Sequence, residues 1–125
     1  MLEWVLKIHE RTYKLIEEGK KTIDGRIPDH GNGINYSLME EGQYVRFKLT
    51  ESNTISEKRY IIRYIHHYDT IREMLTYEGL NCVFPTADSI EEGVERYHNF
   101  PEYKERESKY GVYAIGIEYD SLNED

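Results

Sequence analysis

The side chains best suited to chemistry are concentrated at residues 19–26, GKKTIDGR, where two lysines, a hydroxyl, a carboxylate and a guanidinium follow one another. Arg26 offers a planar fork of donors that matches a phosphate or the edge of a base. Asp24 can orient that guanidinium or accept a hydrogen bond from an amino group. Lys21 can act as a point charge, or as a desolvated amine of lowered pKa. Gathered in one cleft, these groups would bind an anion or a base.

The same segment is predicted to be a strand, residues 20–27, that begins where a short helix ends. Because side chains alternate along a strand, Thr22, Asp24 and Arg26 should share one face, and Lys21 should point to the other. The alternative is a charged, solvent-exposed strand in which Asp24 and Arg26 pair with each other and bind nothing.

Other chemically active residue types are scattered. His66 and His67 are neighbours on a predicted strand and therefore face opposite sides, so they cannot both hold one metal ion in the usual way. His98 lies at the expected end of a helix, where a capping or packing role is common. Cys82 is the only cysteine and has no motif around it. We therefore expect no metal site and no cofactor.

The charge of the chain is unevenly distributed. Its net charge is -8, from 16 Lys and Arg against 24 Asp and Glu, which by itself argues against a general nucleic-acid-binding protein. Residues 76–125 hold four basic and twelve acidic side chains, whereas residues 1–30 and 31–75 each hold six of both. The first part of the chain can therefore carry a local basic cleft. The 12 tyrosines either pack a small barrel or line such a cleft.

Hydrophobic periodicity predicts the order strand, helix, three strands, two helices, strand. The expected strands cover about residues 4–8, 20–27, 42–49, 58–68 and 110–119, and the first helix residues 10–18. Two capping-box pairs, Thr70 with Glu73 and Ser89 with Glu92, mark the later helices. This order indicates an α+β protein, a small, mostly antiparallel β-barrel flanked by short helices.

The length of 125 residues fits one domain, which we expect over residues 1–118, followed by an acidic C-terminal tail at 119–125. No apolar run approaches the roughly 18 residues of a membrane-spanning helix, and the first residues lack a signal-peptide layout. The expectation is a cytoplasmic protein that does not enter a membrane.

The segment GKKTIDGR resembles the G-x-K-T-I-E-x-R signature of the ASCH domain family, whose fold is a PUA-like β-barrel. Further stretches follow in the family's order: GQYVRF at 42–47, YDTIREML at 68–75, EGL at 78–80, Pro85, YH at 97–98 and YGVYAI at 110–115. The resemblance spans roughly residues 4 to 118. It implies a cleft that accepts RNA or a nucleotide-like ligand, with ligand-binding residues at Lys20, Lys21, Thr22, Asp24 and Arg26.

Two further functions stay open beside RNA or nucleotide binding. One branch of the family contains amidohydrolases that remove the acetyl group from N4-acetylcytidine, using the signature lysine, a threonine and a later glutamate. By position these correspond to Lys21, to Asp24 in place of the threonine, and to Glu78. The protein would then be a nucleoside amidohydrolase or another RNA-processing hydrolase. Lys21 would be the activating amine, Thr22 or a water held by Asp24 would be the nucleophile, and Glu78 would be the proton shuttle. The other possibility is a protein-interaction domain whose acidic C-terminal half meets a basic partner.

Overall fold

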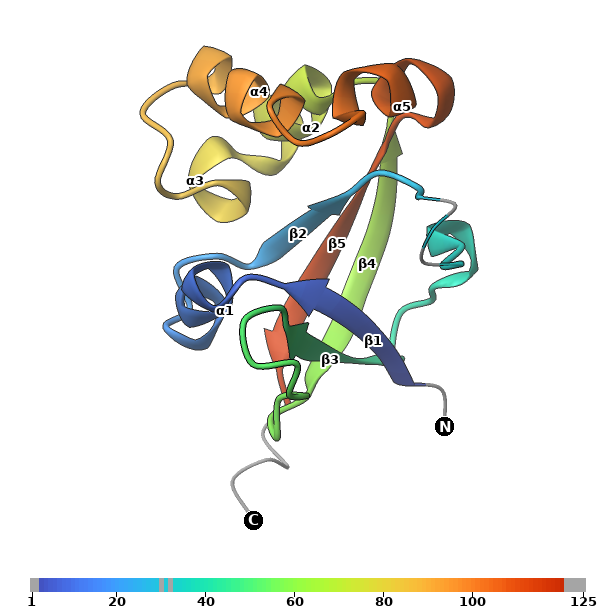
Figure 1. The fold of residues 1–125 in the computed structure, drawn as a ribbon, viewed down its shortest axis with the longest axis vertical. Helices are drawn as coiled ribbons and strands as arrows, with labels where there is room; N and C mark the ends of the chain where they lie inside the picture. The colour runs from blue at the N-terminus through green and yellow to red at the C-terminus, as the bar shows by residue number, and fades with distance from the viewer. Residues whose placement is uncertain (1–2, 30, 32, 121–125) are drawn as a thin grey trace.

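A computed structural model describes residues 3–29, 31 and 33–120. Figure 1 shows a curved sheet with helices at its upper end and one helix beside its lower half. The elements in chain order are β1 (Glu3–Ile8), α1 (Glu10–Glu17), β2 (Ile23–Arg26), the 3-10 turn η1 (Tyr36–Leu38), β3 (Tyr44–Leu49), β4 (Tyr60–Tyr68), α2 (Ile71–Glu78), α3 (Leu80–Val83), α4 (Ile90–His98), α5 (Tyr103–Tyr110) and β5 (Val112–Tyr119).

The strands form one sheet in the order β1-β3-β4-β5-β2. β1 and β3 run parallel, and the other neighbouring strands run antiparallel. The predicted α+β class with a mostly antiparallel sheet is therefore confirmed. The sheet is not closed, because no ladder of hydrogen bonds joins β1 to β2 within the described residues. These two strands remain as free edges, and the site described below lies between them.

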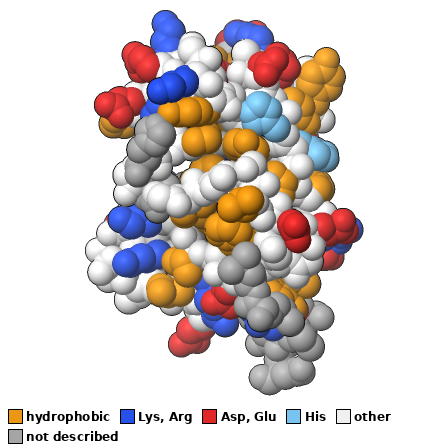
Figure 2. All heavy atoms as spheres, turned by 90° about the vertical axis from the view of Figure 1, so that its right-hand side faces the viewer, with side chains coloured by type: hydrophobic (Ala, Val, Ile, Leu, Met, Phe, Trp, Pro, Cys, Tyr) orange, Lys and Arg blue, Asp and Glu red, His pale blue; other side chains and the backbone are white. Residues whose placement is uncertain are grey.

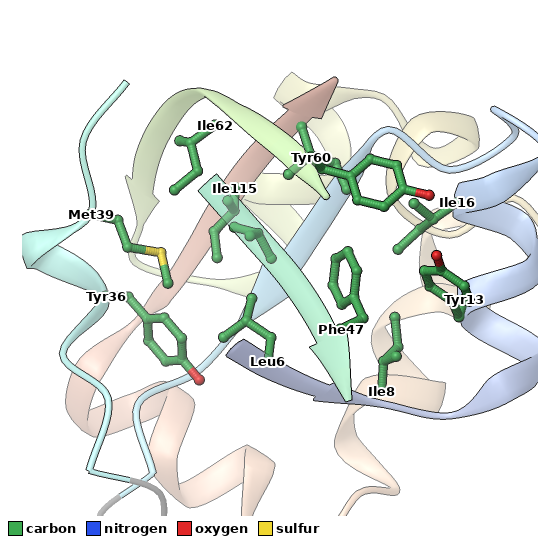
Figure 3. Packing of buried hydrophobic residues seen from close by; sticks show 12 residues of the cluster. Leu6, Ile8, Tyr13, Ile16, Tyr36, Met39, Phe47, Tyr60, Ile62 and Ile115 are labelled. Atoms are coloured by element: carbon green, nitrogen blue, oxygen red, sulfur yellow. The ribbon is translucent and has the colours of Figure 1, made fainter. Parts of the chain in front are cut away.

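A hydrophobic core fills the space between the sheet and α1 (Figure 3). Leu6, Phe47 and Ile62 come from three strands and are at most 1% exposed, while Tyr13 and Ile16 reach in from α1. The rings of Tyr13 and Phe47 lie 5.7 Å apart, a distance typical of attractive aromatic pairs. This packing fixes α1 against the sheet, and with it the turn that leads from α1 into β2.

A second core holds the helices over the other end of the sheet. Ile71, Met74 and Leu75 of α2 are fully buried, and they pack with Val112 and Ala114 of β5. Tyr97 of α4 joins the same cluster. Because α4 and the segment after α3 are tied to the sheet in this way, their side chains can form a wall opposite α1.

The predicted N-caps at Thr70 and Ser89 are confirmed. The hydroxyl of Thr70 accepts a hydrogen bond from the amide of Glu73, and that of Ser89 from the amide of Glu92, both at 3.1 Å. Two helices were not predicted. α3 has a single turn, too short to show periodicity, and α5 is strongly polar with no buried residue, so it lacks the apolar stripe that marks a helix in a sequence.

The boundary predicted for the C-terminal tail falls inside the sheet. β5 continues to Tyr119, and Asp120 is 3% exposed and accepts a hydrogen bond from Arg59 at 2.8 Å. The first two residues of the predicted tail therefore belong to the folded domain. Residues 121–125 lie outside the described part of the chain.

Figure 2 shows the face that is on the right in Figure 1. Hydrophobic side chains gather in its middle, histidine side chains lie beside them nearer the top, and charged side chains lie mostly toward its edges. α1 and α3 lie on the other side of the molecule, on the left in Figure 1. The candidate cavity is on that side, and residues of α1 and of the segment after α3 line it. No helix among the described residues is long and apolar enough to cross a membrane.

Candidate functional site

The turn between α1 and β2 decides where Lys21 lies. The backbone amides of Lys20 and Lys21 both donate to the carbonyl of Leu15 at the end of α1, so neither residue is part of the strand. β2 begins only at Ile23. The prediction that Lys21 points away from Asp24 is therefore wrong, because strand alternation starts three residues later than expected, and both side chains line one cavity.

Lys21 is a buried cation, 6% exposed. Its Nζ donates to the carbonyl oxygens of Ile23, at 2.8 Å, and of Val83. Burial lowers the pKa of Lys21 to about 8; the charge of Asp24 opposes this shift and that of Arg26 adds to it. A neutral amine that donates both hydrogens to these carbonyls keeps its lone pair for another partner, and an ammonium keeps its third hydrogen.

Asp24 and Arg26 share one face of β2, two residues apart, as predicted. The carboxylate of Asp24 is 2.7 Å from Nε of Arg26, and both side chains are largely buried. Burial by itself would lower the pKa of Arg26, but the Asp24 carboxylate, Tyr36 and Tyr103 together outweigh it, and the pKa is raised. The guanidinium is held as a cation, and among the described residues only Asp24 is a hydrogen-bond partner of this side chain, so its other N–H groups can donate to a ligand.

These three side chains line a cavity of about 260 Å³. It lies between the two edges of the open sheet, because Lys7 and Ile8 of β1 line one part of it and β2 lines another. The aromatic side chains on its wall come from the chain after α3 and from α4 and its surroundings: Phe84, Tyr97, Phe100 and Tyr103. The cavity therefore combines flat apolar surfaces with converging polar groups, which is the usual build of a small-molecule site.

The lining of the cavity has an excess of positive charge. Lys7, Lys21 and Arg26 line it, together with His9, while Asp24 is the only carboxylate among the described residues that line it. Since the whole chain carries a net charge of -8, this local balance is opposite to the overall one. A site of this kind attracts an anionic ligand.

Two of the predicted ligand-binding residues are not brought to the cavity. Lys20 is exposed, and its Nζ lies 3.6 Å from the carboxylate of Glu18. Thr22 is exposed as well, and its backbone amide donates to the carbonyl of Cys82. Neither residue is among those that line the cavity. The short β2 again explains both positions, because residues 20–22 belong to the turn.

Glu78, the predicted proton shuttle, lies in a separate cluster at the end of α2. Its carboxylate accepts hydrogen bonds from the hydroxyls of Tyr64, at 2.7 Å, and Tyr68, at 2.5 Å, and lies 2.6 Å from Nδ1 of His66. Burial alone would raise the pKa of Glu78, but these three partners lower it overall. Glu78 does not line the cavity that contains Lys21.

The sequence interpretation missed the residues that other elements bring to the cavity. Lys7 comes from β1, Phe84 follows α3, and Tyr97 and Phe100 come from the end of α4. No motif joins them, because they meet only through the tertiary structure. A weak signal was present in the aromatic residues around the second capping-box helix. Among the described residues, no group of three or more His, Cys, Asp or Glu side chains could hold a metal ion.

No family model matches the sequence, and no curated protein does. Solved structures do match. The hypothetical protein PH0355 is 35% identical, with a TM-score of 0.78, over 95% of this chain and 100% of its own. The protein PF0455 from Pyrococcus furiosus is 34% identical, with a TM-score of 0.71, over 96% of this chain and 99% of its own.

A third structure supplies the name of the fold. The ASCH protein of Zymomonas mobilis, ZmASCH, solved in a mutant form, has a TM-score of 0.57 and 14% identity, over 97% of this chain and 76% of its own. This chain has an ASCH-like fold. PH0355 and PF0455 are relatives over nearly its whole length, whereas at 14% identity the likeness to ZmASCH shows the fold alone. The ASCH resemblance seen in the sequence is thus confirmed.

Proposed function

We propose that this ASCH protein binds a nucleotide or single-stranded RNA in the cavity between β1 and β2. The observation that carries the proposal is the local excess of cations on an aromatic-walled cavity in an otherwise acidic chain. Phosphate contact needs such cations, and bases stack on exposed aromatic rings with about 1–3 kcal/mol for each base. A volume of about 260 Å³ suits one base or nucleoside of such a ligand and excludes a duplex.

The size and walls of the cavity favour a single base or nucleoside. Its volume of about 260 Å³ is just below the roughly 300–1,000 Å³ of pockets that hold drug-sized ligands. Phe84 and Phe100 offer ring faces, while Asp24 and Arg26 offer an acceptor beside donors, the combination that reads the edge of a base. Lys21 supplies one more donor from the floor of the cavity.

Two adjacent lysines allow a matched test of the proposal. Lys21→Met removes the buried amine and keeps a side chain of similar length, whereas Lys20→Met removes an exposed charge only one residue away. We expect Lys21→Met to weaken binding of nucleoside monophosphates and of a six-nucleotide single-stranded RNA by about tenfold or more, and Lys20→Met by less than about twofold. Isothermal titration calorimetry measures both. Equal effects, or no binding by the wild type, would refute the proposal.

A second candidate is hydrolysis of an amide on a modified nucleoside, which the lowered pKa of Lys21 favours. As a neutral amine, Lys21 could take a proton from water while the hydroxide adds to the acyl carbon. The carbon–nitrogen bond then breaks, and the proton passes to the departing amine. Because Thr22 and Glu78 do not line the cavity, this route depends on Lys21 and Asp24 alone.

Release of acetate from N4-acetylcytidine tests this candidate. The activity should disappear in Lys21→Met and persist in Lys20→Met and in Glu78→Gln. If the wild type releases no acetate from a panel of acylated nucleosides that it binds, the protein is a binding domain and the second candidate is rejected.

A further inference from the structure

The cavity continues outward into a wider hollow of about 550 Å³. Six residues line both spaces, Phe84 and Phe100 among them, so the two are contiguous. The residues that line the outer hollow alone are Arg11, Arg96 and Asn99. Each has a hydrogen-bond donor, two are cations, and no Asp or Glu among the described residues lines this hollow. A ligand that extends out of the inner cavity therefore meets donors and positive charge.

Arg96 is held in place from two sides. Its Nη1 donates to the hydroxyl of Thr86 at 2.9 Å, and its guanidinium lies over the ring of Phe84, 5.3 Å from the ring centre. Glu92 approaches its Nε at 3.5 Å from the neighbouring turn of α4. A guanidinium has five N–H groups, so donors remain for a ligand while the plane is already fixed. Such preorganisation favours recognition of a phosphate.

Arg11 is in the first turn of α1, and no ion pair joins it to the described residues. His9, the residue before α1, makes no side-chain cap, but the carboxylate of Glu51 accepts a hydrogen bond from the amide of Glu10 at 2.9 Å. His9 and Thr12 also line the hollow. Because an acidic side chain already caps the start of α1, the positive charge of the hollow comes from the two arginines.

We propose that the outer hollow is a phosphate subsite and that the ligand of this protein is a phosphorylated nucleoside, not a free one. The inference rests on the proposed function, because the base must occupy the inner cavity for its phosphate to reach Arg11 and Arg96. The shared chemistry is a nucleoside phosphate, present in free nucleotides and along single-stranded RNA. The inner cavity supplies recognition of the base, and the outer hollow supplies selection for phosphate.

Titration calorimetry of matched ligands tests the subsite. The ligands are the four common ribonucleosides, their 3′- and 5′-monophosphates, and a six-nucleotide single-stranded RNA. We expect one series of monophosphates to bind at least about tenfold tighter than the nucleosides. In the double variant Arg11→Gln, Arg96→Gln this preference should fall to about twofold or less. Arg72→Gln, an exposed arginine paired with Glu91 away from both spaces, is the control and should keep it. Thermal melts verify that each variant is folded.

The possible results separate the two levels of the proposal. If nucleosides and monophosphates bind equally to the wild type, or if the preference survives in the double variant, the phosphate subsite is overturned while nucleotide-sized binding in the cavity stands. If no nucleoside, monophosphate or RNA binds, both are overturned. If the RNA binds more tightly than either monophosphate, the ligand is single-stranded RNA. If the RNA and the monophosphates bind with equal affinity, the ligand is the free nucleotide. Both results support the phosphate subsite.

Discussion

Two buried carboxylates on this molecule have opposite surroundings. Asp24 lies on an edge strand, pairs with Arg26 at 2.7 Å, and lines a cavity together with further cations. Glu78 is at the end of α2, and its two oxygens are occupied by Tyr64, Tyr68 and His66. Both are carboxylates with close partners in the folded chain.

The two carboxylates differ in whether donors or cations are left over once their own hydrogen bonds are made. Around Glu78 the donors match the acceptor, and Glu78 lines neither the inner cavity nor the outer hollow, so we assign the cluster to the stability of the junction between β4 and α2. Around Asp24 the cations outnumber the carboxylate and face an open space. A buried carboxylate is therefore weak evidence of a site, whereas donors in excess that point into a cavity are stronger evidence.

The largest expected effect comes from breaking the pair at the cavity. Arg26→Leu leaves the carboxylate of Asp24 buried without its partner, and removing one member of a buried pair costs about 3–5 kcal/mol of unfolding free energy. Urea denaturation measures the loss. If the free energy of unfolding falls by less than about 1 kcal/mol, the Asp24–Arg26 pair is as solvated as a surface ion pair and is not a buried pair.

The buried amine of Lys21 predicts a dependence of stability on pH. Its pKa is about 8 in the folded chain and 10.5 when unperturbed, so the unfolded chain binds more protons between these values. The wild type should therefore gain stability relative to Lys21→Met as the pH rises from 8 to 10.5, by about 3 kcal/mol in total. Below pH 8 the difference should stay constant. A difference that does not change across this window would contradict the burial of the amine.

A smaller effect is expected at the second carboxylate. Glu78→Gln weakens three hydrogen bonds and should lower the free energy of unfolding by about 1–3 kcal/mol at neutral pH. The pKa of Glu78 is lower in the folded chain than the 4.5 of the unfolded chain. Its carboxylate therefore contributes to the free energy of unfolding above pH 4.5, and this contribution is lost as the pH falls through the pKa of the folded chain. Denaturation at pH 7 and at pH 3 compares the two conditions. Nucleotide affinity should change by less than about twofold; a larger loss would join Glu78 to the site.

The smallest effect is expected at Thr22, the signature hydroxyl. Since Thr22 is exposed and does not line the cavity, Thr22→Ala should change both stability and nucleotide affinity by less than about 0.5 kcal/mol. The same denaturation and titration experiments measure it. A clear loss of affinity would mean that the turn at residues 20–22 rearranges when the ligand binds.

Local patterns in the sequence predicted the strands, the capped helices and the family. Thr70 and Ser89 mark helix starts through a hydrogen bond over three residues, so a short stretch of sequence contains the whole signal. The closure of the sheet and the location of Glu78 depend on contacts between distant elements, and no local pattern reports them. The position of Lys21 was mistaken for a simpler reason, since the turn after α1 extends through Thr22 and the strand begins three residues later than predicted.

A nucleotide should bind at the open edge of the sheet and not at the cluster on β4. Backbone amide shifts of the labelled protein, recorded as nucleoside monophosphates are added, distinguish the two places. We expect the largest changes on residues 21–26, on residues 83–86 and on the first turn of α1. Changes concentrated instead on Tyr64, His66, Tyr68 and Glu78, with the cavity residues unmoved, would contradict this expectation.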